Sequence, residues 1–309
     1  MARLPKTILS FGEVLWDLMP DGMRLGGAPF NLAYRLNSLG DRALPISRLG
    51  TDVLGRRAYE QGLSIGLDMS GVQWDEEHPT GTVHVTFDEQ QNPDYVIVPG
   101  VAYDHIVATP AILKVAAECD SFCFGTLAQR CETSRRACRA VLDASSRAVK
   151  LLDLNLRKEC YTSETAVESV KSADIVKLNE DEVETLGGLL GLSRGDVVEV
   201  AVQLLERFAL ECCVVTLGER GAVAVSSSGE SVCVPGFRVE FADALGAGDA
   251  FTAGFLRRYL RGEALFDCCV YGNAMGALAA SRPGATAPIS RDEVEALVSS
   301  MRPFSSVTS

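Results

Sequence analysis

Short apolar runs alternate with longer amphipathic segments along most of this chain. Five runs have the length and composition of buried strands: residues 7–11, 121–124, 149–153, 175–178 and 212–216. Helical spacing of apolar residues is clearest over 134–144 and 197–208, and a further helix is expected between Gly26 and Gly40. This alternation predicts an α/β fold in which a mostly parallel sheet carries helices on both faces.

One region departs from this rhythm. Residues 82–88 alternate apolar and polar side chains, and a polar turn separates them from the apolar run 95–98. The pattern predicts an antiparallel hairpin with one exposed face. A small sheet inserted early in an α/β domain is a candidate lid.

Composition narrows the class of protein. The 309 residues are 47% hydrophobic and carry a net charge of −12, which repels nucleic acid and anionic membranes. A phosphate site must therefore be locally positive. No apolar run approaches the ~20 residues of a membrane span, and no signal peptide is evident, so we expect a cytoplasmic protein. The ten cysteines show no Cys-x-x-Cys spacing and favour buried thiols over a zinc site or disulfides.

The clearest chemical signal is the sequence Phe-Ala-Asp-Ala-Leu-Gly-Ala-Gly-Asp-Ala-Phe, in which a small turn separates Asp243 from Asp249. If a helix starts there, the N–H groups of Gly246, Ala247 and Gly248 favour an anion. A carboxylate beside an anion site suits a base that takes a proton from an attacking hydroxyl. The pattern predicts phosphoryl transfer to an alcohol. The alternative is that Asp249 simply caps a core helix.

Three other motifs are excluded by the residues around them. No glycine is followed by lysine, so the chain has no Walker-type phosphate loop. A dinucleotide fingerprint would need a third glycine where Phe251 stands. Gly62-Leu-Ser-Ile-Gly66 fits the spacing of a nucleophile elbow, but it follows the helical residues 56–61 and is interpreted as the end of a helix.

The run from Asp243 to Asp249 resembles the C-terminal signature of the ribokinase-like (PfkB) carbohydrate kinases, usually Asp-Thr-x-Gly-Ala-Gly-Asp. Ala244 replaces the threonine here, which removes a hydroxyl and keeps both acids. Other segments are similar to the fructokinase-like branch and occur in family order. They are residues 12–17, 26–31, 78–81, 124–130, 153–157, 177–182 and 216–221.

The resemblance implies a ribokinase-like three-layer fold, as one domain over residues 1–309, with a β lid formed by about 14–27 and 76–104. It implies an ATP-dependent kinase that phosphorylates a primary hydroxyl, with D-fructose as the first choice and fructose 6-phosphate as product. Asp249 would be the base, and Gly246, Ala247 and Gly248 would stabilise the transferred phosphoryl group.

By resemblance the sugar site comprises Asp17, Gly26, Gly27, Asn31, Gln129 and Arg157, and Arg130 could reach the sugar in place of Gln129. Asp17 and Asn31 are short polar groups of the kind that sugar hydroxyls need, and a glycine turn lets the backbone approach the ring. Arg157 follows a strand end and suits a phosphate or sugar oxygen. Each residue also has a structural alternative. Asp17 could be a turn aspartate and Asn31 a solvent-facing side chain of a helix. Gln129 could simply be solvated, and Arg157 could form a surface ion pair.

The resemblance also implies ATP and Mg²⁺ as cofactors. The nucleotide would contact Asn179, Thr216, Gly218, Gly221 and Asn273. Glu182 would organise Mg²⁺ through water, and Asp243 with nearby carbonyls would hold a K⁺ ion. An acidic helix start favoured by the helix dipole is the alternative for Glu182, and a plain helix is the alternative for Asn273.

Several questions stay open at this point. The substrate could instead be 2-keto-3-deoxygluconate, ribose or a nucleoside, and a non-catalytic sugar-binding paralogue is the alternative from another class. We expect small-molecule partners, no nucleic acid and no membrane. Pairing of two lids would hide their exposed strand edges, which predicts a homodimer.

Overall fold

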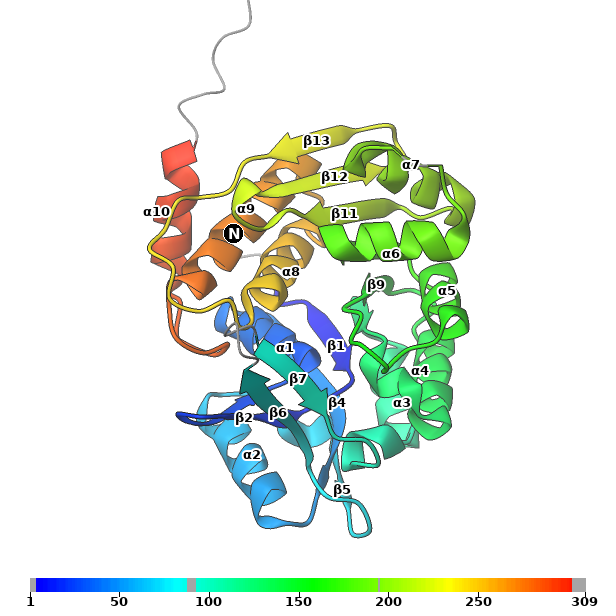
Figure 1. Cartoon of the computed structure of the whole chain (residues 1–309), viewed down its shortest axis with the longest axis vertical. Coiled ribbons are helices and arrows are strands. Elements are labelled where there is room, and N and C mark those ends of the chain that lie inside the picture. Colours follow the sequence, from blue (N-terminus) through cyan, green and yellow to red (C-terminus); the bar gives the residue numbers. More distant parts are fainter. Residues whose placement is uncertain (1–3, 88–92, 194, 302–309) are drawn as a thin grey trace, which may run out of the picture. The chain divides into compact units, whose positions relative to one another are not determined.

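The computed structural model describes residues 4–87, 93–193 and 195–301, which fall into two compact units (Figure 1). The N-terminal unit comprises residues 1–37 and 41–174, and the C-terminal unit comprises residues 38–40 and 175–309. The expected single domain over the whole chain stays a prediction.

Parallel strands form the core of the N-terminal unit, in the order β9-β8-β1-β4-β5. They are β1 Thr7–Phe11, β4 Arg42–Gly50, β5 Val72–Asp75, β8 Ser121–Phe124 and β9 Val149–Asp153. β1 pairs with both β4 and β8, and its Ile8 and Leu9 are fully buried. The strands expected over 7–11, 121–124 and 149–153 are confirmed.

Helices cover this sheet. They are α1 Ala28–Ser38, α2 Val53–Ser64, α3 Pro110–Ala116, α4 Glu132–Ala144 and α5 Ser163–Lys171. Asp52 caps α2 by accepting a hydrogen bond from the Gly55 N–H. Ser64 lies in the last turn of α2, where its hydroxyl donates to the Gln61 carbonyl, so the apparent nucleophile elbow is the end of a helix.

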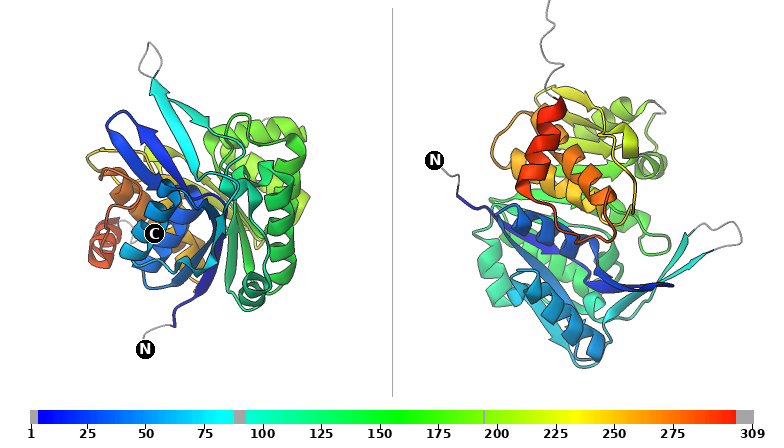
Figure 2. Two further views of the ribbon diagram at one scale, coloured as in Figure 1. Left: turned by 90° about the horizontal axis from the view of Figure 1, so that it is seen from below. Right: turned by 90° about the vertical axis from the view of Figure 1, so that its left-hand side faces the viewer.

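A second sheet of the N-terminal unit contains four strands in the order β3-β2-β6-β7. They are β2 Leu15–Met19, β3 Gly22–Gly26, β6 Gly81–Phe87 and β7 Pro93–Ile97. β6 and β7 are antiparallel, as the hairpin pattern predicts, although the turn between them lies outside the described residues. Figure 2 shows these strands extending beyond the helices of the unit.

The C-terminal unit has its own sheet order, β13-β12-β11-β10. Its strands are β10 Ile175–Asn179, β11 Cys212–Thr216, β12 Ala222–Ser226 and β13 Ser231–Val234. The first two are parallel and match the predicted strands, with β10 one residue longer. The last two are antiparallel additions joined by a short turn, which the sequence analysis did not identify.

Five α-helices complete the described part of the C-terminal unit. They are α6 Glu180–Leu190, α7 Val197–Phe208, α8 Ala247–Tyr259, α9 Leu265–Ala280 and α10 Arg291–Met301. α8 and α9 pack closely because both carry glycine at the contact. A Cβ atom on Gly254 would lie 3.0 Å from the Tyr271 carbonyl oxygen, and one on Gly272 would lie 2.9 Å from the Phe251 ring.

The state of the cysteines and the length of the apolar helices were both predicted from the sequence. Eight of the ten cysteines are buried and all are free thiols, and burial raises the pKa of Cys123 and of Cys213 to about 12. Among the described residues, no helix is long and apolar enough to span a bilayer.

Candidate active site

Three residues of the predicted sugar site converge in the N-terminal unit. Asp17 lies on β2, Gly26 ends β3 and Asn31 lies in the first turns of α1. A Cβ atom on Gly26 would lie 3.0 Å from the Asp17 Oδ2 atom and 4.0 Å from the Asn31 Oδ1 atom. Both polar side chains are buried. The structure therefore brings a carboxylate and an amide together around a glycine that leaves space beside them.

Glu13 organises the loop that carries these groups. Its Oε1 atom accepts a hydrogen bond of 3.0 Å from the Ala28 N–H at the start of α1. Gly27 has a φ of 110°, and a Cβ there would lie 2.3 Å from the Glu13 carbonyl oxygen. The Asn31 N–H donates to the Gly27 carbonyl. No role for Glu13 was predicted, and the signal that could have found it is an acid between Gly12 and the apolar residues that follow.

Gln129 and Arg157 have different surroundings. The Gln129 side chain is buried, and its Nε2 atom donates to the Gly125 carbonyl and to the Ser169 hydroxyl. These contacts give Gln129 a structural role within the unit. Arg157 is exposed in the loop that follows β9. A contact of either residue with a sugar stays a prediction.

The Gly-Ala-Gly turn begins α8, as the sequence predicts. Gly246 is the N-cap, with a φ of 73°, and a Cβ there would lie 2.6 Å from the Ala285 Cβ atom. No described side chain caps this helix. The Ala247 N–H donates to the Ala244 carbonyl at 3.2 Å, so one of the three expected donors also closes the turn. Asp249 lies in the first helical turn.

Asp243 shapes the loop before α8. Its Oδ1 atom accepts a hydrogen bond from the Leu245 N–H at 2.9 Å, and its Oδ2 atom accepts one from the Gly284 N–H at 3.0 Å. The Asp243 N–H itself donates to the Ala280 carbonyl. Both carboxylate oxygens therefore accept from backbone N–H groups, and the role of Asp243 as a K⁺ ligand stays a prediction.

Lys177 lies within the segment 177–182 that resembles the family, and the sequence alone predicts no role for it. It is a buried lysine on β10, and its Nζ atom lies 3.4 Å from where a Cβ on Gly248 would stand. An ammonium group thus lies beside the N-terminus of α8, where the helix dipole is also positive. The signal was a charged residue inside the apolar run Ile-Val-Lys-Leu.

Asn179 and Glu182 form a reciprocal cap at the start of α6. The Asn179 Oδ1 atom accepts from the Glu182 N–H, and the Glu182 Oε2 atom accepts from the Asn179 N–H, both at 2.9 Å. Among the described residues, no group of three or more His, Cys, Asp or Glu side chains has the arrangement of a metal site. The cap fixes one carboxylate at a strand end, which fits a metal held through water rather than by a full set of ligands.

The other predicted nucleotide residues lie at the end of β11, in the turn between β11 and β12, and on α9. The Thr216 hydroxyl donates to the Leu178 carbonyl, and Gly218 and Gly221 have positive φ angles in the turn that follows. A Cβ on Gly221 would lie 2.0 Å from the Val234 carbonyl oxygen. The buried Asn273 amide donates to the Val234 and Pro235 carbonyls, so it joins α9 to β13, and its contact with adenine stays a prediction.

Comparison with known proteins identifies the family. Residues 8–292 match the model of the pfkB family of carbohydrate kinases. The chain belongs to this family. It is therefore a phosphotransferase that acts on a sugar hydroxyl, and its fructokinase relatives support the fructokinase-like branch.

Three similar proteins illustrate the range of this kinase's relatives. Fructokinase-1 of Oryza sativa subsp. japonica is 30% identical over 96% of this chain and 98% of its own length. A 2-dehydro-3-deoxygalactonokinase of Haloferax volcanii is 29% identical over 93% of this chain and 95% of its own. A double mutant of the Vibrio cholerae O395 fructokinase, solved with fructose, ADP and potassium, has a TM-score of 0.82 and 25% identity over 96% of this chain and all of its own.

Proposed function

We propose that this sugar kinase uses ATP to phosphorylate a primary hydroxyl of a ketose, with D-fructose as substrate and fructose 6-phosphate as product. The observation that carries the proposal is Asp249, an acid in the first turn of a helix whose N-terminus no described side chain caps. Asp17 and Asn31 around Gly26 supply the sugar-binding groups in the other unit.

In this proposal the Asp249 carboxylate takes the proton of the attacking hydroxyl. The developing negative charge on the phosphoryl group is stabilised by the N–H groups at the start of α8, of which the Ala247 N–H also closes the turn. The Lys177 ammonium lies beside the same N–H groups and adds positive charge there. Both features act most strongly where water is excluded.

Two ions fit the residues present. Glu182 and Asn179 would hold Mg²⁺ through water, and the metal would neutralise charge on the phosphate oxygens. Asp243, whose carboxylate is oriented by the N–H groups of Leu245 and Gly284, would hold K⁺ beside the α8 turn together with nearby carbonyls. The Vibrio cholerae fructokinase was solved with potassium and ADP, and this supports both ATP and a monovalent ion here.

The lid proposal concerns the sheet of β2, β3, β6 and β7. This sheet contains Asp17, so its closure over the sugar would order a binding group and exclude water in the same motion. Its edge strands β3 and β7 would pair with those of a second copy in the expected homodimer.

A second substrate class has one observation in its favour. The Haloferax volcanii relative acts on a 2-dehydro-3-deoxy sugar acid and matches this chain about as well as the fructokinases do. The two candidates differ at C1, which is a carboxylate in the keto acid, and at C3, where the keto acid lacks the hydroxyl, so a neutral ketose and a keto acid test them directly.

A sugar panel with coupled detection of ADP decides between the candidates. D-fructose, 2-keto-3-deoxygluconate, ribose and a nucleoside are compared with the same purified protein and Mg²⁺-ATP. We expect the highest kcat/KM for D-fructose. A higher value for the keto acid, or activity with ribose and none with fructose, would replace the proposed substrate. Sugar binding by calorimetry with no ADP formation from any sugar would overturn the kinase reaction itself.

A further inference from the structure

Arg130 lies at the end of the turn Leu127–Arg130 that follows β8. Its guanidinium group forms two hydrogen bonds with one carboxylate, that of Asp104. The Nε atom donates to the Asp104 Oδ1 atom at 2.8 Å, and an Nη2 atom donates to Oδ2 at 2.9 Å. The two side chains are 12% and 4% exposed. Burial alone would lower the pKa of Arg130, but the bonds to Asp104 raise its pKa overall. This two-point pair needs the planar fork of arginine.

The same guanidinium reaches the segment by which the chain leaves β7. Its Nη2 atom donates to the Val98 carbonyl at 2.8 Å, one residue beyond the end of the strand. Asp104 adds to this contact because its Oδ2 atom accepts hydrogen bonds from the Gly100 and Val101 N–H groups. The exit from the β6–β7 hairpin is therefore tied to one buried ion pair.

Arg130 also contacts the entry to the hairpin, through Tyr103. The Nη2 atom donates to the Tyr103 hydroxyl at 3.0 Å, and the guanidinium lies 5.2 Å from the centre of the ring. The ring in turn packs against Gly81, the first residue of β6, where a Cβ would lie 2.4 Å from the Cε1 atom of the tyrosine. Glycine at this position is what lets the strand begin beside the ring.

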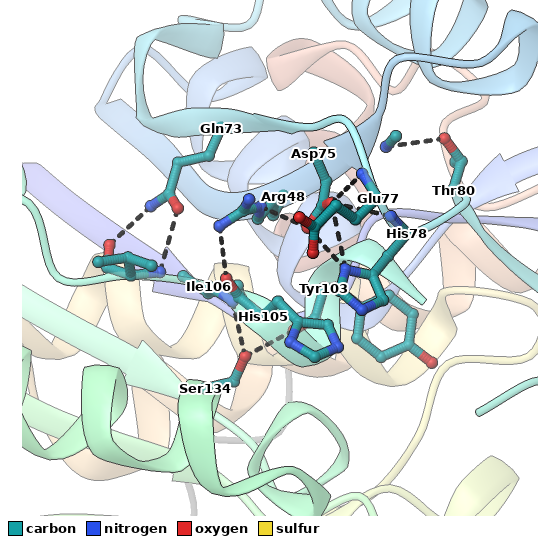
Figure 3. A network of polar contacts seen from close by, with 12 residues as sticks. Arg48, Gln73, Asp75, Glu77, His78, Thr80, Tyr103, His105, Ile106 and Ser134 are labelled. Carbon is teal, nitrogen blue, oxygen red and sulfur yellow. Dashed lines mark hydrogen bonds and ion pairs between the residues drawn. The ribbon is translucent and has the colours of Figure 1, made fainter. Parts of the chain in front are cut away.

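A second network joins the same two connections (Figure 3). His78, which precedes β6, stacks on His105 with ring centres 3.6 Å apart. Its Nδ1 atom faces the buried Asp75 carboxylate, and Arg48 joins Asp75 to the His105 carbonyl. Entry and exit of the hairpin are thus held together at two places, of which the Arg130 network is the more buried.

Arg130 has one further contact, toward the loop that carries Arg157. An Nη1 atom lies 3.6 Å from the Sγ atom of Cys160, and the Cys160 N–H donates to the Arg157 carbonyl. A group that bound the sugar itself would need donors pointing away from the protein. Arg130 instead directs its donors to Asp104, Val98 and Tyr103.

We propose that Arg130 is a positioning residue of the lid, which fixes both ends of the β6–β7 hairpin so that the lid sheet closes in one position over the sugar. This inference rests on the proposed function, because it assumes a lid that excludes water during phosphoryl transfer. Arg130 acts through Asp104, Tyr103 and Val98. Its loss therefore affects the coupling of ATP consumption to sugar phosphorylation, which a purely structural ion pair would not affect.

The test is Arg130→Lys, which keeps the positive charge and loses the fork. The measured quantities are KM for the sugar, kcat, and the ratio of ADP formed to sugar phosphate formed. We expect kcat to fall by about tenfold to a hundredfold, because a shift of about 1 Å in a positioned group has effects of this size. We expect the ratio to rise clearly above the wild-type value, since a loosely held lid admits water.

The matched control is Arg258→Lys in the C-terminal unit. Arg258 is also partly buried between two carboxylates, Glu263 and Glu295, and lies over the ring of Tyr271. It touches no part of the lid sheet that the structure describes. Like Arg130→Lys, this variant weakens a partly buried ion pair and is expected to lower the free energy of unfolding. We expect it to leave the ratio of ADP to sugar phosphate unchanged.

A second lid variant keeps the proposal testable if Arg130→Lys does not fold. Tyr103→Phe retains the Arg130–Asp104 pair and removes only the hydroxyl acceptor. It should raise the ratio in the same direction by a smaller factor. A higher sugar KM with a wild-type ratio would show that Arg130 contacts the sugar, and unchanged kinetics in both variants would also overturn the proposal. Failure of the proposed function is separate, because wild-type protein would then form no sugar-dependent ADP.

Discussion

The two units of this kinase build their binding groups by opposite means. In the N-terminal unit, side chains from β2 and α1 converge on a glycine, so the proposed sugar recognition rests on Asp17 and Asn31. In the C-terminal unit, the backbone itself forms the proposed phosphate site, because Gly246 begins α8 in a left-handed conformation that leaves the helix N-terminus without a side-chain cap among the described residues.

This difference suits the two substrates. Sugars differ in the positions of their hydroxyls, and side chains can change one at a time to match them. The phosphates of a nucleotide always present the same negative oxygens, and N–H groups at a helix start bind these without reading any other feature. We therefore expect substitutions in the N-terminal site to alter which sugar is used, and substitutions in the C-terminal turn to alter turnover.

The largest expected effect comes from Asp249→Asn. The amide keeps the size of the side chain and cannot take the proton, so kcat should fall by about 10³-fold or more if Asp249 is the general base. Sugar affinity, measured by calorimetry without ATP, should stay close to that of the wild type. Turnover within a few-fold of wild type in the purified, folded variant would remove Asp249 from this role.

Gly246→Ala should have the next largest effect. The added Cβ would lie 2.6 Å from the Ala285 Cβ atom, at a φ of 73° that side-chain-bearing residues rarely adopt. The α8 N-terminus must then shift, and kcat should fall by about 100-fold while the sugar KM changes little.

Gly229→Ala is the control for Gly246→Ala. Gly229 has a φ of 86° in the turn between β12 and β13, with no atom within 4 Å of the added Cβ among those described. It carries the same backbone strain without the collision. Equal losses of kcat in the two variants would mean that strain alone explains the result and that the α8 turn has no special role.

Asp17→Asn tests the proposed sugar site of the N-terminal unit. Loss of one charged hydrogen-bond partner should raise the sugar KM by about tenfold to a hundredfold, with the ATP KM unchanged. Asp21→Asn is the control, because Asp21 follows β2 and makes an exposed ion pair with Arg24. A rise in the ATP KM, or an equal effect of both variants, would contradict a sugar-binding role for Asp17.

The sequence reveals these two kinds of site to different degrees. The Gly-Ala-Gly turn and the bounds of β1, β8, β9, β10 and β11 follow from local pattern, since glycine placement and apolar runs are properties of neighbouring residues. Asp17 and Asn31 are visible as short polar residues, and the resemblance adds their role. The partners of Arg130 are not visible, because Asp104 is 26 residues away and only the fold brings the pair together.

Lys177 and Gln129 also show what a single sequence cannot predict. Lys177 had no predicted role, whereas Gln129 was predicted to contact the sugar. Lys177 stands in an apolar strand, and nothing in its neighbours says that α8 begins beside it. Gln129 lies within a segment that resembles the family, yet its amide serves the Gly125 carbonyl and the Ser169 hydroxyl. The surroundings of both side chains are set by packing between segments that are distant in the sequence, and this packing cannot be inferred from a single sequence.

The smallest expected effect is a dependence of stability on pH that belongs to one unit. All three histidines lie in the N-terminal unit, as do both tryptophans, so tryptophan fluorescence reports on that unit alone. Burial lowers the pKa of His105 from its ordinary value of 6.5, and the nearby His78 lowers that pKa further. His105 therefore takes up a proton less readily in the folded state than in the unfolded chain.

The sign of the effect follows from this difference. Well above pH 6.5, His105 is neutral in both the folded and the unfolded state, and its contribution to the free energy of unfolding is complete. As the pH falls through 6.5 toward the lower folded pKa, the unfolded chain takes up the proton first, and this contribution is lost. Between about pH 7.5 and about pH 5.5 the Tm followed by tryptophan fluorescence should fall by a few degrees. His105→Phe keeps the ring stack on His78 and removes the titration, so its Tm should vary less over the same interval. An identical slope in the variant would show that the stacked pair is not the source of the pH dependence.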